Sequence, residues 1–228
     1  MPEDHYFSAA PASPDERREV EAVLGGREVT VQTATGVFSG HRVDLGTQVL
    51  LRSVPAPPAS GDLLDLGCGW GPLALSMAVL SPAATVWAVD VNERALDLVR
   101  RNAAGLGLHG VRAVRPEQVP PELRLAAIWS NPPIRVGKSA LHDLLATWLR
   151  RLDDGSAAHL VVQRNLGADS LLAWLRAQAA AEALGPRMDV RKAASAKGFR
   201  VLVAERAPVE ADVSSATRAG GADPRDAG

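Results

Sequence analysis

The sequence contains a single cysteine, Cys68, among its 228 residues. One cysteine cannot form a disulfide within the chain, which excludes the disulfide-rich secreted domains. No apolar run reaches the roughly 18 residues that a membrane-spanning helix needs, and residues 1–5 lack the basic and then apolar order of a signal peptide. We therefore expect a soluble, cytoplasmic protein that has no membrane partner.

The sequence also lacks an excess of either charge, because it has 25 Lys and Arg residues and 26 Asp and Glu residues, for a formal net charge of −1. This balance argues against the large, sequence-independent nucleic-acid surface of a strongly basic domain. Most basic residues are Arg, which suits planar contacts to phosphate or bases, although a GC-rich genome enriches Arg equally well. The length and the hydrophobic content of 46% predict one sizeable core in one domain with appendages.

Residues 62–73 have the pattern of a short apolar strand, a glycine-rich turn and the start of a helix. Gly67, Gly69 and Gly71 let the backbone turn sharply and approach a ligand closely, and Pro72 suits the first helical position. Such a unit places free backbone N–H groups at the carboxyl end of a strand, where open α/β sheets bind nucleotide-like ligands. The spacing is G-x-G-x-G, which differs from the G-x-G-x-x-G of dinucleotide binders.

A second apolar run, residues 84–89, ends in Asp90, and a helical pattern starts at Asn92. An acid at this position can accept hydrogen bonds from both hydroxyls of a ribose. With Asp65 just before the glycine turn, the pattern resembles the class I S-adenosylmethionine-dependent methyltransferases. The resemblance implies an α/β fold with a Rossmann-like seven-stranded sheet, helices on both faces, and S-adenosylmethionine as the cofactor. No metal is implied.

The resemblance also implies which residues contact the cofactor. They are Asp65, Gly67, Cys68, Gly69, Gly71, Asp90, Val91, Asn131, Asp44, Thr47 and Glu117. Asp65 would order the glycine turn near the methionine amino group, or it is simply the polar end of a strand. Asp44 and Thr47 would lie near the cofactor, or they merely cap a helix. Cys68 fills a place that needs a small residue and is a poor candidate for a nucleophile.

A third motif, Asn131-Pro132-Pro133-Ile134, follows the apolar run of residues 125–130 and resembles the [DN]-P-P-x motif of methyltransferases that modify planar nitrogens. Such a nitrogen has a delocalised lone pair, so acceptors must hold its N–H groups and orient it toward the methyl group. The Asn131 side-chain oxygen and the Pro132 carbonyl would be these acceptors, and Pro132 and Pro133 would stiffen the loop. By itself, Asn-Pro is also a common turn.

A narrower resemblance covers roughly residues 5–205 and points to small, single-domain members of the bacterial 16S ribosomal RNA guanine-N2 methyltransferase family. The matching segments are residues 131–138 with His142, and residues 36–39, 43–47, 162–164 and 197–202. The resemblance implies methyl transfer to the exocyclic amine of a guanine, with ribosomal RNA or the small ribosomal subunit as the partner. Ile134, Arg135 and Lys138 would then contact the substrate.

Two departures from the family pattern bear on the site. Ile134 stands where many amino-methyltransferases have an aromatic residue that stacks on the base, so stacking must be weaker or come from elsewhere. The third strand ends in Val114-Arg115-Pro116-Glu117, where the family usually has Ser-Asp, and Glu117 substitutes for the residue that meets the adenine amine. Two alternatives stay open: methylation of a protein glutamine or an adenine, and a ribosome-assembly module that binds S-adenosylmethionine without turnover.

Three regions are expected along the chain: an N-terminal extension packed on the sheet at residues 1–58, the methyltransferase domain at residues 59–206, and a disordered tail at residues 207–228. The extension should hold a hairpin of residues 27–33 and 36–39, followed by a short helix within residues 43–51. Further strands are expected at residues 63–66, 85–89, 111–115, 125–130, 157–162, 187–192 and 199–204. The expected helices are residues 72–80, 93–106, 139–151 and 168–183.

Overall fold

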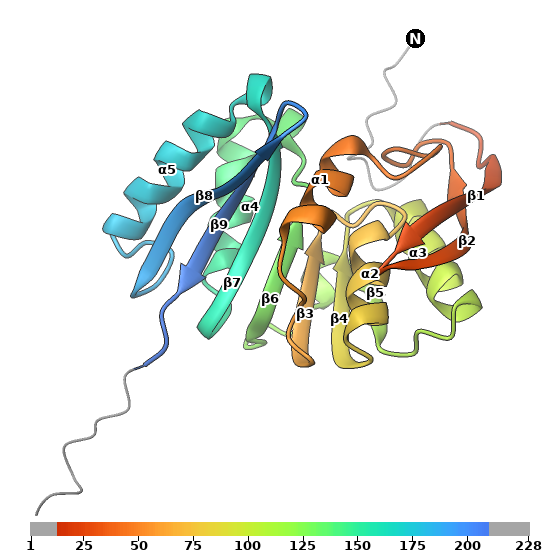
Figure 1. Ribbon diagram of the computed structural model, residues 1–228, viewed down its shortest axis with the longest axis horizontal. Helices are drawn as coiled ribbons and strands as arrows, with labels where there is room; N and C mark the ends of the chain where they lie inside the picture. Colours follow the sequence, from red (N-terminus) through yellow and green to blue (C-terminus); the bar gives the residue numbers. More distant parts are fainter. Residues whose placement is uncertain (1–12, 210–228) are drawn as a thin grey trace, which may run out of the picture.

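The computed structural model describes residues 13–209, in which a seven-stranded sheet has the strand order β5-β4-β3-β6-β7-β9-β8 (Figure 1). The strands are β3 (Ser60–Leu66), β4 (Ala83–Val89), β5 (Val111–Val114), β6 (Leu125–Ser130), β7 (Leu152–Gln163), β8 (Met188–Ala196) and β9 (Phe199–Arg206). Strands β3 to β7 pair in parallel, and β9 is antiparallel between β7 and β8. The predicted Rossmann-like sheet is confirmed.

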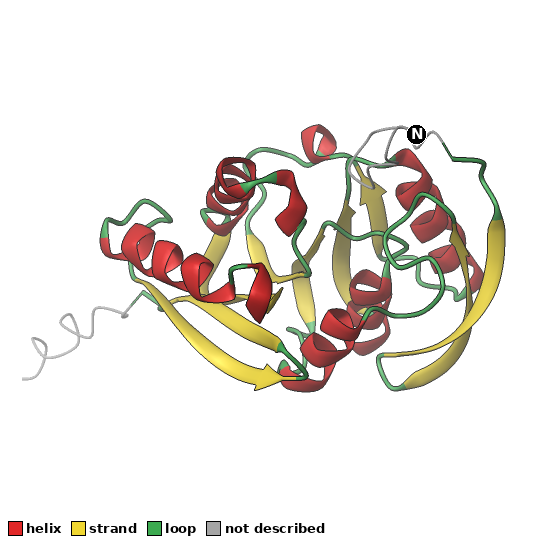
Figure 2. Ribbon diagram, turned by 90° about the horizontal axis from the view of Figure 1, so that it is seen from above, coloured by secondary structure: helices red, strands yellow, loops and turns green. Residues whose placement is uncertain are grey.

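Helices cover both faces of this sheet, as the view from above shows (Figure 2). They are α1 (Leu45–Ser53), α2 (Pro72–Leu80), α3 (Glu93–Gly105), α4 (Lys138–Leu149) and α5 (Ala168–Ala180). Because side chains alternate along a strand, Leu63 packs with α1, α2 and α3, whereas Leu64 packs with α4 and α5. The sheet thus separates two apolar cores. No helix within residues 13–209 is long and apolar enough to cross a membrane.

The chain changes direction across the sheet at β3. It runs outward through β4 to β5, and then returns to the other side of β3 as β6. Open α/β sheets bind ligands at such a point, beyond the carboxyl ends of the strands. Leu66 is paired with both Val89 of β4 and Ser130 of β6, and the Ser130 hydroxyl donates to the Leu66 carbonyl at 2.6 Å. The residues that follow these three strands therefore meet at one place.

The predicted hairpin has the wrong partner strand. β2 (Arg27–Ala34) matches its prediction, but it pairs with β1 (Arg17–Leu24), which precedes it, and residues 36–39 form a turn. Residues Gly25 and Gly26 connect the strands with φ of 56° and 80°, as a two-residue hairpin turn requires. β1 was missed because its outward positions carry charged residues, which masked the alternation of its inward positions.

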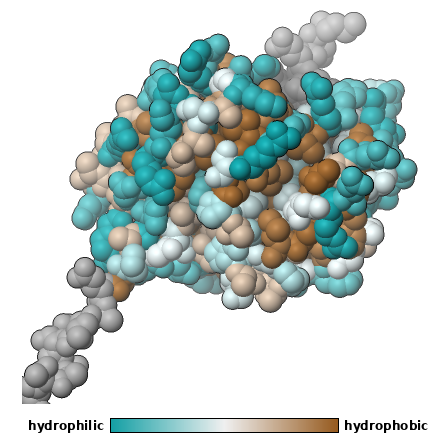
Figure 3. Space-filling model, viewed as in Figure 1, coloured by the Kyte–Doolittle hydropathy of each residue, from teal (hydrophilic) through white to brown (hydrophobic). Residues whose placement is uncertain are grey.

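The hairpin packs on helices α2 and α3 rather than on the sheet, at the end of the molecule beyond β5 (Figure 1). Asn102 of α3 binds the backbone of Gln32 in both directions, through Oδ1 at 2.7 Å and Nδ2 at 2.9 Å. Helix α1 lies against β7 and β9. On the face seen in Figure 3, hydrophobic residues gather in the middle, over α1 and α2.

Most other element boundaries agree with the predictions to within a few residues. The largest differences are at β7, which starts at Leu152 rather than at residue 157, and at β8, which ends at Ala196 rather than at residue 192. Helix α5 stops at Ala180 rather than at residue 183. Glu182 follows α5 with φ of 52°, which is incompatible with a continuing helix. Residues 5–8 and most of the predicted disordered tail lie outside the described residues.

Candidate active site

A cavity of about 450 Å³ lies at the carboxyl ends of β3, β4, β6 and β7. Ten of the predicted site residues line it: Asp44, Gly67, Gly69, Asp90, Val91, Asn131, Pro132, Pro133, Ile134 and Arg135. A recess of about 20 Å³ shares several of these residues and adds Thr47, Asp65 and Cys68. Segments that are far apart in sequence, from Val37 to Phe199, thus form one site.

Three predicted residues lie outside the lining of both spaces. Gly71 has φ of 96° and caps α2, and a Cβ there would lie 2.9 Å from Val99. Its hydrogen side chain is needed for helix packing. The Glu117 side chain is 67% exposed and faces Arg115 at 3.9 Å, whereas its neighbour Pro116 lines the cavity. Lys138 is exposed at the start of α4.

The glycine turn is held in place by its own N–H groups. The backbone N atoms of Gly67 and Cys68 donate to the Val89 carbonyl at 2.8 and 3.1 Å. Gly67 has φ of 76°, and a Cβ there would lie 3.7 Å from the Pro133 ring. Bare backbone therefore faces the cavity where the turn approaches the loop after β6. The buried Cys68 thiol has a pKa well above its usual value, mainly because of burial, which argues against a nucleophilic role.

Asp65 has a buried carboxylate with one oxygen left unsatisfied. Oδ2 accepts from the Ala74 backbone N at 2.8 Å at the start of α2, but Oδ1 has no partner among residues 13–209. Burial, with a smaller contribution from the negative charge of Asp90, raises the pKa of Asp65 to about 8. A buried acceptor with no donor is costly unless a ligand supplies one. An ammonium group in the adjoining recess would satisfy this oxygen.

Asp90 joins the glycine turn to the start of α3. Its Oδ2 accepts from the Gly69 backbone N at 3.0 Å, and its Oδ1 accepts from the Asn92 backbone N at 3.0 Å. A carboxylate has about four lone-pair sites, so both oxygens can still accept from a ligand in the cavity. Burial raises the pKa of Asp90, and the backbone hydrogen bonds oppose this effect.

The amide group of Asn131 has a defined orientation. Its Nδ2 donates to Asp44 Oδ2 at 3.0 Å and to Thr47 Oγ1 at 3.2 Å. The same Asp44 oxygen caps α1 by accepting from the Gly46 backbone N at 2.7 Å. Because a carboxylate can only accept, the NH₂ group must face Asp44, and Oδ1 is left as an acceptor with no partner in the described part of the chain.

The loop after Asn131 is a tight turn. The Ile134 backbone N donates to the Pro132 carbonyl at 2.8 Å, and Pro133 has φ of −74° and ψ of 76°, the geometry of an inverse γ-turn. The Pro132 carbonyl keeps a second lone pair. The turn holds two acceptors, Asn131 Oδ1 and Pro132 O, in one short segment at the cavity.

The wall formed by residues 37–39 is anchored from two sides. The Trp70 indole N donates to the Ser39 carbonyl at 3.2 Å, and Trp70 itself is buried. The Asn92 side-chain N donates to the Gly36 carbonyl at 2.9 Å. The predicted strand at this position is instead a turn that lines the cavity, with Phe38 44% exposed.

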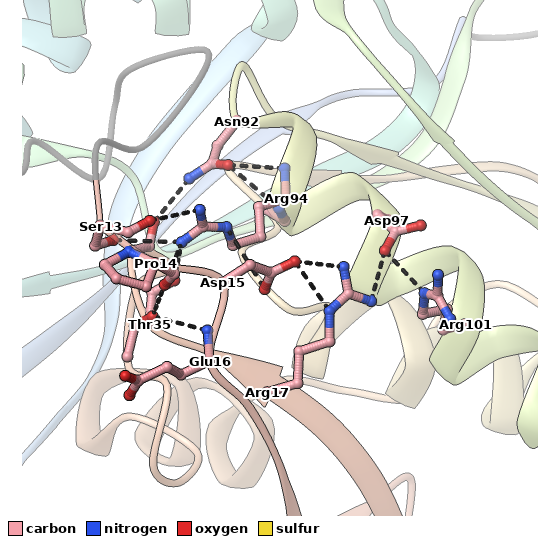
Figure 4. Close-up of polar contacts among 12 residues, drawn as sticks. Ser13, Pro14, Asp15, Glu16, Arg17, Thr35, Asn92, Arg94, Asp97 and Arg101 are labelled. Carbon is pink, nitrogen blue, oxygen red and sulfur yellow. Dashed lines mark hydrogen bonds and ion pairs between the residues drawn. The ribbon is translucent and has the colours of Figure 1, made fainter.

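Arg94 ties the beginning of the described chain to Thr35, which follows β2 and precedes this wall (Figure 4). Its guanidinium donates to the carbonyl oxygens of Ser13 at 2.8 Å, Pro14 at 3.3 Å and Thr35 at 2.7 Å. Nearby, Arg17 bridges Asp15 and the α3 residue Asp97. The role of Arg94 was missed because its partners are backbone carbonyls distant in sequence, which leave no motif.

Residues 28–201 match the family described as the methyltransferase small domain. The chain belongs to this family. As a methyltransferase of this kind it uses S-adenosylmethionine as the methyl donor. The residues at the cavity fit that cofactor. The unsatisfied Asp65 oxygen can accept from its ammonium group. The bare glycine turn lets the cofactor lie close to the backbone, and the Asp90 carboxylate can accept from its ribose.

Similar proteins extend the family match. The "Uncharacterized protein YbxB" of Bacillus subtilis strain 168 is 33% identical over 172 residues, which are 74% of this chain and 86% of that protein. A ribosomal RNA small subunit methyltransferase C of Aeromonas hydrophila is 37% identical over 142 residues, which are 62% of this chain and 40% of that protein.

Among solved structures, the Thermus thermophilus 16S rRNA N2 G1207 methyltransferase (RsmC) in complex with AdoMet and guanosine has a TM-score of 0.68 and 25% identity. The match covers 86% of this chain and 52% of that chain. TrmN from Thermus thermophilus has a TM-score of 0.51 and 30% identity over 70% of this chain and 47% of its own. The chain thus spans about half the length of these three proteins.

Proposed function

We propose that this methyltransferase modifies the exocyclic N2 amine of a guanine in 16S ribosomal RNA. The observation that carries the proposal is the fixed amide of Asn131, whose NH₂ group is held by Asp44 and Thr47 so that Oδ1 can accept from a planar amine. Two similar proteins are named as small-subunit rRNA methyltransferases, and one was solved with guanosine.

In this proposal Asn131 Oδ1 and the Pro132 carbonyl accept the two N–H groups of the amine. These two acceptors would hold the amine so that its nitrogen lone pair faces the methyl group that S-adenosylmethionine would supply, and the amine proton would leave to solvent after the transfer. The sulfonium supplies an activated methyl group and a good leaving group. The chain therefore needs to position the amine rather than to remove its proton first.

The remaining cofactor assignments are proposals of the same kind. Asp65 Oδ1 accepts from the ammonium of the methionine part, and Asp90 accepts from the ribose hydroxyls. Gly67 and Gly69 let the backbone lie against the ligand. Val91 and Pro116 also line the cavity, and in this proposal they flank the adenine. Ile134 and Arg135 also line the cavity, and in this proposal they contact the target base and its backbone.

The proposal is tested in a strain that lacks the gene. Mass spectrometry of nucleosides from purified 16S rRNA should show less N2-methylguanosine than in the parent, with recovery on expression of the wild-type chain but not of the Asn131→Ala variant. An unchanged N2-methylguanosine content, together with loss of methylglutamine or N6-methyladenosine, would assign the enzyme to one of those substrates instead.

A further inference from the structure

The connections on one side of the cavity mouth carry positive charge without compensating acids. The loops that follow β6 and β7, with the first residue of α4, contain Arg135, Lys138 and Arg164 but no Asp or Glu. The β8–β9 turn adds Lys197. Because β6, β7 and β9 are neighbours in the sheet, these connections lie next to one another.

The two cations that sequence patterns left unassigned are fixed beside each other. The Arg164 backbone N donates to the Gly198 carbonyl at 2.8 Å, which ties the short 3₁₀ turn after β7 to the β8–β9 turn. One residue further in, Gln163 pairs with Phe199, and both line the cavity. Arg164 and Lys197 are exposed immediately outside these lining residues.

Lys197 occupies a backbone position that suits other residues better. It has φ of 50° and Gly198 has φ of 80° in a two-residue turn between the paired residues Ala196 and Phe199. Positive φ at both positions favours Asn-Gly, and a lysine is uncommon there. The turn therefore carries a cation where its backbone geometry alone would favour asparagine.

The four basic side chains also form no ion pairs with the described part of the chain. Arg135, Lys138, Arg164 and Lys197 make no ion pair with any residue from 13 to 209. In contrast, the adjacent Arg200 is paired with Asp169. Their charge is therefore available to a polyanion.

We propose that Arg164 and Lys197 join Arg135 and Lys138 in a basic edge that holds the phosphate backbone of the rRNA strand beside the cavity. This inference rests on the proposed function, and it adds two residues and a binding surface to it. A strand bound along the basic edge presents a base to the cavity from the side of β6, β7 and β9. The small net charge of the whole chain is thus consistent with RNA binding, because the positive charge is local.

The size of the effect follows from counterion release. Each phosphate contact to a single strand contributes about 0.7 to the slope of log K against log salt. Removal of two contacts should therefore reduce the slope by about 1.4 and weaken binding at 0.15 M salt by about tenfold.

The experiment compares two doubly substituted full-length chains that lose the same charge. Arg164→Gln with Lys197→Asn removes the new part of the basic edge, and the asparagine suits the turn. Arg27→Gln with Arg112→Gln removes two exposed cations that lie on β2 and β5, away from the cavity. Binding of 30S subunits and of 16S rRNA is measured between 0.05 and about 0.3 M salt, alongside calorimetry with S-adenosylmethionine.

We expect the first variant to show the tenfold loss and the smaller slope, with unchanged cofactor affinity, and the control to bind as the wild type. Equal binding by both variants, or an equal loss in both, would overturn the basic edge. The methylated nucleoside is identified separately with the wild-type chain. If this chain methylates no rRNA guanine while the binding difference remains, the proposed function fails and the basic edge stands.

Discussion

At the scale of single residues, the buried Asp65 carboxylate lowers the stability of the free protein and has a proposed role in cofactor binding. Its pKa is raised to about 8 in the folded protein, so between pH 4 and pH 8 the folded state keeps a proton that the unfolded state has lost. This group's contribution to stability is therefore full at low pH and declines as the pH rises toward 8. If Asp65 had no binding function, its replacement by a neutral residue would make the protein more stable near pH 8.

We expect Asp65→Asn to raise the thermal midpoint of the free protein at pH 8, with a difference that shrinks toward pH 5, because the neutral amide has no ionisation cost. The same change should weaken S-adenosylmethionine binding at pH 8, since the single amide oxygen is needed by the Ala74 backbone N and the NH₂ group then faces the ammonium. Thermal unfolding at several pH values and calorimetry measure the two effects. Asp143→Asn, at an exposed position, is the control. A lower midpoint at pH 8 would contradict the pKa assignment.

Asp90 should contribute more to binding than to folding. If it accepts from both ribose hydroxyls, Asp90→Ala leaves them unpaired and weakens S-adenosylmethionine binding by roughly 2–6 kcal/mol, at about 1–3 kcal/mol for each buried unpaired group. The Gly69 N–H also loses its acceptor, so the glycine turn loosens. Calorimetry with the variant tests this, and an unchanged affinity would remove Asp90 from the cofactor site.

Thr47 offers a test of the Asn131 orientation that leaves Asn131 in place. Thr47→Val keeps the shape of the side chain but removes one of the two acceptors of the Asn131 NH₂ group. We expect single-turnover methylation to slow by about tenfold, while S-adenosylmethionine affinity stays close to the wild type. Thr147→Val, which alters an exposed hydroxyl on α4, is the matched control. Equal rates for both variants would argue that Asp44 alone holds the amide.

At the scale of helices and strands, local sequence patterns predicted those features that depend on residues close together in the sequence. The sequence predicted the glycine turn before α2 and Asp44 as the cap of α1, because in each case the residues that determine the local structure are adjacent in the sequence. The contact of Asp44 and Thr47 with Asn131 was not predictable, because the partners are more than 80 residues apart and meet only through the sheet. The β1–β2 pairing was missed for the different reason that charged outward positions hid the alternation.

The anchoring of the hairpin to α3 leads to a prediction about stability. Arg94→Ala removes hydrogen bonds to the backbone of three residues, and we expect a loss of about 1–3 kcal/mol of unfolding free energy. The wall of residues 37–39 should loosen as well and weaken cofactor binding. Denaturant unfolding measures the first effect. Arg101→Ala is the control, because its pair with Asp97 is exposed and should contribute under about 0.5 kcal/mol. Similar losses in both variants would contradict the anchoring role.

At the scale of the whole molecule, the sheet brings the three sequence motifs to one edge, and the family match agrees with that arrangement. The order of the motifs along the chain predicted the fold, since each follows a parallel strand. The charge distribution could not be read in the same way. Arg164 and Lys197 lie in segments that resemble the family pattern, but the sequence does not show that they meet. Only the pairing of β7 with β9 brings them together at the cavity.

The role of Asn131 in guanine methylation is tested by single-turnover methylation of 30S subunits and 16S rRNA with labelled S-adenosylmethionine, followed by nucleoside analysis. We expect the wild-type chain to place the label in N2-methylguanosine. We expect Asn131→Ala to lower the rate at least about a hundredfold, close to 3 kcal/mol, with cofactor affinity nearly intact. Full activity of this variant, or label in adenosine or in protein glutamine, would contradict the account.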